Sequence, residues 1–210
     1  MIISPGRKYI FVHIPKTGGT ALSLALEDRA MADDILIGDT PKAERRRAKA
    51  KKWAKDRKLR KHSRLSELDG LLDAEKYFVV TLVRNPWDRM VSYYHWLKEQ
   101  TFDHRAVTLA RTHGFSDFLN HRETLAMLKA ETYASYVKAP NVDPLFVRLE
   151  NLAGDIQPFE AHLGFSLKIP HVNRSTRDAD WRGYYSGGDA ELVGKLCAED
   201  IERFGYGFDG

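Results

Sequence analysis

The sequence predicts a three-layer α/β sandwich in which a central, mainly parallel sheet is flanked by helices. Short runs of β-branched and aromatic residues alternate along the 210-residue chain with segments that show helical spacing of apolar residues. The clearest run, residues 76–83 (KYFVVTLV), is apolar on both faces, as expected for a central parallel strand. With 43% hydrophobic residues, the chain can fill the core of a single domain that covers residues 1–210.

The first elements form the beginning of a predicted βαβ unit. Residues 8–14 (KYIFVHI) have the composition of a buried strand, and a Gly-Gly turn follows them. Residues 20–31 place Leu22 and Leu26 at helical spacing, with Thr20 near the start of the helix. We expect further strands at 34–37 and 144–149, and further helices at 63–72, 88–100, 115–119, 124–137, 150–163 and 189–204.

The positive charge of the chain is concentrated in one segment. The formal net charge is +4, but residues 42–64 alone hold 13 Lys and Arg against two acidic residues. We expect a basic helical or mobile insertion at about 41–64, which could bind an anionic polymer. The rest of the chain is net acidic, so a nucleic-acid partner is not expected.

The only cysteine, Cys197, has no partner for an intrachain disulfide, which is typical of a reducing compartment. The sequence shows no signal-peptide pattern and no apolar stretch long enough to span a membrane. These features predict a cytoplasmic protein without a membrane span.

The segment Pro15–Thr20 (PKTGGT) lies between the first predicted strand and helix, where backbone N–H groups and the helix dipole favour an anion. Gly18 and Gly19 permit a tight turn and close approach of the backbone, and Lys16 adds a full charge. The lysine precedes the glycines, whereas a Walker A motif places it after them. A P-loop kinase using ATP and magnesium is therefore disfavoured, and it remains an alternative, as does a non-catalytic module that binds a nucleotide or a polyanion.

A second motif follows the strand at 76–83. Arg84 stands at the end of the strand and can bind a phosphate bidentately, and Ser92 lies about two helical turns later.

Together, HIPKTGGT and VTLVRNPWDRMVSYYH resemble the two cofactor motifs of the sulfotransferases that use 3′-phosphoadenosine 5′-phosphosulfate (PAPS). Within that family the sequence is most similar to the carbohydrate sulfotransferase group, both Golgi-type and bacterial. FVRLENLAGDI, IPHVNRSTR and AEDIERFGYGF resemble later segments of the family, so the similarity covers nearly the whole chain except residues 41–61. The resemblance implies a P-loop-like fold and transfer of a sulfuryl group to a carbohydrate or glycoconjugate hydroxyl.

The resemblance also implies roles for individual residues. Lys16 would contact the phosphosulfate and stabilise the leaving oxygen, and Thr17, Gly18, Gly19 and Thr20 would hold the 5′-phosphate. Arg84 and Ser92 would hold the 3′-phosphate. Three further residues match the family less closely and would close over the nucleotide: Arg174, Ser175 and Arg177. The product would be adenosine 3′,5′-bisphosphate (PAP). No cluster in the sequence has metal-ligand spacing, and no metal is expected.

The acceptor hydroxyl needs a base, and a histidine suits this task near neutral pH. His62 is the first candidate, because some carbohydrate sulfotransferases resemble this chain and place a catalytic histidine before the strand that leads to Arg84. His13, next to the phosphate loop, is the second candidate. Sequence alone leaves four further residues open: His95, Glu27, Glu150 and His171.

Overall fold

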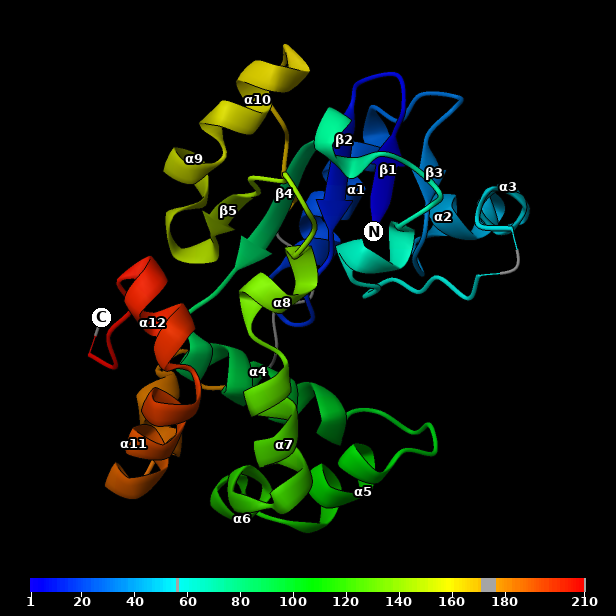
Figure 1. The fold of residues 1–210 in the computed structure, drawn as a ribbon. Helices are drawn as coiled ribbons and strands as arrows, with labels where there is room; N and C mark the ends of the chain where they lie inside the picture. The colour runs from blue at the N-terminus through cyan, green and yellow to red at the C-terminus, as the bar shows by residue number, and fades with distance from the viewer. Residues whose placement is uncertain (56, 171–176, 210) are drawn as a thin grey trace. The chain divides into compact units, whose positions relative to one another are not determined.

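The computed structural model describes residues 1–55, 57–170 and 177–209, which form two compact units (Figure 1). The sheet unit comprises residues 1–83 and 134–173. The helical unit comprises residues 84–133 and 174–210. The expectation of one domain over 1–210 stays a prediction.

The sheet unit is built on a five-stranded sheet with the order β3-β1-β2-β4-β5. Its strands are β1 (Ile2–Ser4), β2 (Tyr9–Val12), β3 (Ile35–Leu36), β4 (Phe78–Val83) and β5 (Leu145–Arg148). β2, β4 and β5 are parallel, in a register that pairs Tyr9 with Phe78 and Val80 with Leu145. β1 runs antiparallel to both of its neighbours, so the described sheet is mixed but mostly parallel, as predicted.

Both faces of the central strands are buried, which explains their continuous hydrophobic sequence. On one face, Phe11 and Val80 pack in a cluster with Leu22 of the first helix and with Phe159. On the other face, Ile10 is also fully buried.

The helices of the sheet unit are short. They are α1 (Gly19–Asp28), α2 (Pro41–Arg45), α3 (Arg47–Trp53), α9 (Leu152–Asp155) and α10 (Gln157–Leu163), with 3-10 turns η1 (Leu65–Leu68), η2 (Ala74–Lys76) and η3 (Leu149–Asn151). The helix predicted at 150–163 is interrupted at Ile156, before a segment that starts with Gln157-Pro158, because proline has no N–H to continue the helical ladder. The prediction of a helix at 63–72 was wrong, because only the short 3-10 turn η1 forms there.

The helical unit contains α4 (Pro86–Lys98), α5 (Arg105–Thr112), α6 (Phe115–Asn120), α7 (Arg122–Ala130), η4 (Trp181–Tyr184), α11 (Gly187–Leu196) and α12 (Ala198–Phe204), and α8 (Tyr133–Val137) spans the junction of the two units. The core of the helical unit is formed around Trp87, Phe118 and Val193. The start of α4 is fixed by Asn85, whose side chain accepts a hydrogen bond from the backbone N–H of Trp87 at 3.1 Å. This cap fixes where the helix that carries Ser92 begins.

Candidate functional site

The predicted phosphate loop connects β2 to α1 through a strained turn. Gly18 caps α1 in the left-handed conformation, with φ of 86°. Lys16 also has a positive φ of 65°, which is uncommon for a residue with a side chain. Such conformations persist only where the surrounding structure enforces them, and they cluster at functional sites. The turn therefore has the features of a binding loop and not only of a connection.

Three contacts enforce the shape of the loop. Thr17 is fully buried, and its hydroxyl donates a hydrogen bond to the carbonyl of Ile14 at 2.9 Å. A Cβ at Gly18 would lie 2.9 Å from Cδ1 of Leu149, and a Cβ at Gly19 would clash with the imidazole of His13. Gly19 is therefore required for lack of space, and Gly18 is favoured by its left-handed backbone conformation. The Thr17 hydroxyl stabilises the loop from inside through its hydrogen bond to Ile14, and its contact with a phosphate stays a prediction.

Two histidines lie beside the loop, with ring centroids 4.8 Å apart in an edge-to-face arrangement. His13 is 3% exposed, and its Nδ1 has no hydrogen-bond partner among the described residues. Burial, with the nearby charges of Lys61 and Lys16, holds the pKa of His13 well below its usual value. His13 is therefore neutral at physiological pH.

His62 has a defined tautomer. Its Nδ1 lies 2.8 Å from the carbonyl oxygen of His13, and since a carbonyl can only accept, Nδ1 carries the proton. The lone pair is then on Nε2. Desolvation of the ring, with a further contribution from Lys61, lowers the pKa of His62 to about 4. His62 is neutral: its ring is partly buried at the contact with His13, but the residue still reaches solvent, unlike His13.

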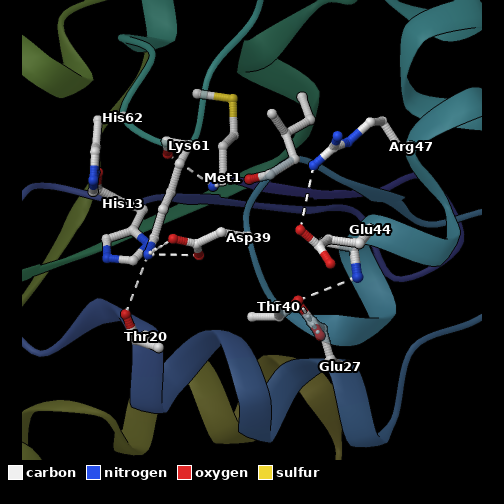
Figure 2. Close-up of polar contacts among 12 residues, drawn as sticks. Met1, His13, Thr20, Glu27, Asp39, Thr40, Glu44, Arg47, Lys61 and His62 are labelled. Carbon is white, nitrogen blue, oxygen red and sulfur yellow. Dashed lines mark hydrogen bonds and ion pairs between the residues drawn. The ribbon is translucent and has the colours of Figure 1, made fainter. Parts of the chain in front are cut away.

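Lys61 brings a second ammonium group to the loop (Figure 2). Its Nζ lies 3.4 Å from the hydroxyl of Thr20, in the first turn of α1, and forms an ion pair of 2.8 Å with Asp39. Burial opposes ionisation of Asp39, but the hydrogen bond and charge of Lys61 lower its pKa below the usual value. Lys61 is thus held where it adds positive potential at the N-terminus of α1.

Glu27 links α1 to the basic segment. It is 4% exposed, and the Thr40 hydroxyl donates to its carboxylate at 2.7 Å (Figure 2). The Lys42 ammonium donates to the backbone carbonyl of Glu27. Thr40 also caps α2, accepting a hydrogen bond from the N–H of Ala43 at 3.2 Å. Burial raises the pKa of Glu27. These contacts anchor the start of the basic segment, which forms α2 and α3.

The second motif lies in the helical unit and is built on an arginine pair. Arg84 contacts Asp88 through Nε at 2.7 Å and Nη2 at 2.6 Å, and Arg177 pairs with the other carboxylate oxygen of Asp88. All three side chains are at most 16% exposed, and together they carry a net charge of +1. Ser92 follows Asp88 by four residues on α4 and is 6% exposed. This arrangement suits an anion with several oxygen atoms.

The structure brings the predicted residues Lys16, Thr17, Gly18, Gly19 and Thr20 together with His13 and His62 in the sheet unit. Arg84 is associated with Arg177 in the helical unit. Arg174, Ser175 and His171 lie outside the described residues. Sequence reasoning missed Lys61, Asp39 and Asp88. Asp88 follows Arg84 by four residues, a spacing that favours an ion pair on a helix and could have been noticed.

The described residues contain no group of three or more His, Cys, Asp and Glu side chains that could hold a metal ion. Within the same ranges, no helix has both the length and the apolar character needed to cross a membrane.

The described fold is an α/β fold in which a loop with two glycines and a lysine joins the second strand to a helix, an arrangement suited to an anion. The comparison with known families agrees: the model described as the sulfotransferase family matches residues 1–143 of the chain. The chain therefore belongs to the sulfotransferase family and is a transferase. No curated protein and no solved structure is significantly similar to it.

Proposed function

We propose that this protein transfers the sulfuryl group of PAPS to a hydroxyl of a carbohydrate or glycoconjugate. The observation that carries the proposal is the loop at Pro15–Thr20, where Lys16 is held in a left-handed conformation beside the N-terminus of α1. Family membership supports sulfuryl transfer, and the donor and the class of acceptor are the proposed parts.

The chemistry of the residues fits the two anionic ends of PAPS. The first N–H groups of α1 have no partner within the helix, and the ammonium group of Lys61 lies beside Thr20, so this end suits the 5′-phosphosulfate. We assign the 3′-phosphate to Arg84 and Ser92, with Arg177 as a further ligand. Guanidinium groups and a hydroxyl are suitable donors for a phosphate dianion.

Lys16 has the role of stabilising the leaving group. As the acceptor oxygen forms its bond to sulfur, the bond from sulfur to the bridging phosphate oxygen breaks, and negative charge collects on that oxygen. A positioned ammonium group stabilises this charge more in the transition state than in the ground state.

His62 is the better of the two candidate bases on the described geometry. Its Nδ1–H is directed to the His13 carbonyl, which leaves the Nε2 lone pair to accept the proton of the acceptor hydroxyl. Its low pKa keeps it unprotonated at neutral pH. His13 is almost fully buried, so we assign it the role of supporting Gly19 and His62.

Thermal-shift titration with PAP, PAPS and ATP–magnesium tests the proposal. PAP and PAPS are expected to raise the melting temperature, because a ligand that binds only the folded state stabilises it. Stabilisation by ATP–magnesium in preference to PAP would overturn the PAPS assignment and favour a kinase.

Lys16→Ala tests the role at the leaving oxygen. We expect turnover with labelled PAPS to fall by about a hundredfold or more, as for loss of one preorganised charge-stabilising group, while PAP affinity changes little. Lys16→Gly, which relieves the positive φ, is the matched control for backbone strain and should lose the same activity. Unchanged turnover in both variants would contradict the role.

A further inference from the structure

The backbone of Arg84, the residue assigned to the 3′-phosphate, is held by a buried phenol. The hydroxyl of Tyr133 donates a hydrogen bond to the Arg84 carbonyl across 49 positions of the chain. The side chain of Tyr133 is fully buried, and a phenol hydroxyl in such surroundings needs a hydrogen-bond partner. Arg84 begins and Tyr133 ends the first stretch of the helical unit, residues 84–133, so this bond closes the stretch on itself.

Tyr133 is itself fixed from two further sides. Its backbone N–H donates to both carboxylate oxygens of Asp200, each at 3.1 Å. The guanidinium group of Arg89 lies over the Tyr133 ring, 5.1 Å from its centroid, an arrangement in which the ring attracts the cation. Arg89 in turn pairs with Glu131 at 3.6 Å. The phenol is therefore held against the Arg84 carbonyl by contacts that do not involve Arg84.

The carbonyl that Tyr133 holds belongs to the peptide plane between Arg84 and Asn85. On the other side of that plane, the Asn85 side chain caps α4 by accepting a hydrogen bond from the N–H of Trp87 at 3.1 Å. The guanidinium group of Arg84 is held at its far end by Asp88. Because a peptide unit is planar and turns as one body, loss of the phenol bond would let the plane tilt and move the side chain that it carries.

We propose that Tyr133 is a positioning residue for the 3′-phosphate: through the Arg84 carbonyl it sets the place of the guanidinium group, and with it the preference for nucleotides that carry a 3′-phosphate. The inference rests on the proposed function, in which Arg84 binds this phosphate. The buried side chain of Tyr133 acts through Arg84 and not on the nucleotide. Small displacements matter, because a charge-assisted hydrogen bond depends on distance and angle, and a binding group needs a rigid support.

Paired affinities for PAP and for adenosine 5′-phosphate (AMP) test this role, because the two nucleotides differ only in the 3′-phosphate. Tyr133→Phe removes the hydroxyl and keeps the ring. By isothermal titration calorimetry on the full chain, we expect the Kd for PAP to rise by about fivefold or more and the Kd for AMP to change by less than about twofold. In turnover, the KM for PAPS should rise while kcat changes by less than about twofold.

Tyr94→Phe is the matched control. Tyr94 is also buried in the helical unit, and its hydroxyl also donates to a backbone carbonyl, that of His113, at 2.8 Å. This variant should lose stability through the same kind of bond without changing the ratio of the AMP Kd to the PAP Kd. In an Arg84→Ala background, Tyr133→Phe should no longer affect PAP affinity, because the group that it positions is absent.

An unchanged ratio in Tyr133→Phe, an equal fall in Tyr94→Phe, or additive effects in the Arg84→Ala background would each overturn the positioning role. Absence of PAP binding by the wild type, or an unchanged ratio in Arg84→Ala, would instead reject the proposed function or its 3′-phosphate assignment. If Tyr133→Phe does not fold, Asp200→Asn, which weakens the hold on the Tyr133 backbone, takes its place. The ratio should then fall in the same direction, and an unchanged ratio there overturns the role as well.

Discussion

The two proposed anion sites are built in different ways. In the sheet unit, the loop at Pro15–Thr20 depends on backbone shape: Gly18 has a left-handed conformation, and Gly19 has no room for a Cβ beside the His13 ring. In the helical unit, Arg84 and Arg177 converge on Asp88, so that site depends on side-chain charge. The loop should be sensitive to added side-chain volume, and the arginine site to loss of charge. The substitutions and conditions below test this difference.

The largest effect is expected from loss of charge in the helical unit. Arg84→Ala should raise the Kd for PAP by about ten- to a hundredfold, because charge-assisted hydrogen bonds contribute ~1.5–3 kcal/mol. Isothermal titration calorimetry measures the change. Arg122→Ala, an exposed arginine on α7, is the control and should leave affinity unaltered. Unchanged affinity in Arg84→Ala would refute the assignment to the 3′-phosphate.

The second-largest effect is expected from added side-chain volume in the loop of the sheet unit. Gly19→Ala is expected to cost ~1–3 kcal/mol of unfolding free energy, because the new Cβ would clash with the His13 ring. Gly187→Ala, also at the first position of a helix but with nothing within 4 Å, is the matched control and should be neutral or stabilising.

A double-mutant cycle links the Gly19 effect to its cause. If the clash with His13 is responsible, Gly19→Ala should cost much less in a His13→Ala background, as measured by urea denaturation. Additive effects would show that the loop excludes a Cβ at Gly19 for another reason.

Acid should weaken the sheet unit through His13. The pKa of His13 is lowered in the folded state, so the unfolded chain takes up its proton first as pH falls below about 6.5. Titration of His13 therefore lowers the free energy of unfolding below that pH. The loss is up to ~1.4 kcal/mol per pH unit between pH 6.5 and 5. His13→Phe removes the titration and should make stability less dependent on pH than in the wild type. Burial raises the pKa of Asp200 to about 6, so titration of Asp200 raises the free energy of unfolding as pH falls. This effect is the same in the wild type and in His13→Phe and cancels when their stabilities are subtracted. Identical slopes for the two proteins would contradict the prediction.

The smallest effect is expected at the Lys61–Asp39 pair. The side chain of Asp39 is 67% exposed, so Asp39→Asn should change the unfolding free energy by less than ~1 kcal/mol. A larger loss, measured by urea denaturation against Asp73→Asn at the exposed pair with Lys76, would show that the pair supports the loop more than its exposure suggests.

Local sequence was sufficient for much of the fold. The parallel strands β2, β4 and β5 were predicted from their composition, because a strand buried on both faces must be apolar throughout. The three-residue strand β1 was missed, since so short a segment has no measurable periodicity and forms through pairing with β2 and β3. The break at Ile156 follows from Pro158 and could have been predicted.

The sequence by itself determined the loop, the motif around Arg84 and the family, because these depend on residues adjacent in the chain. The tertiary structure decided which side chains join them. Lys61 reaches Thr20 across 41 positions, and Arg177 reaches Asp88 across 89. Such contacts arise when packing of the core brings distant segments together, and no local periodicity records them.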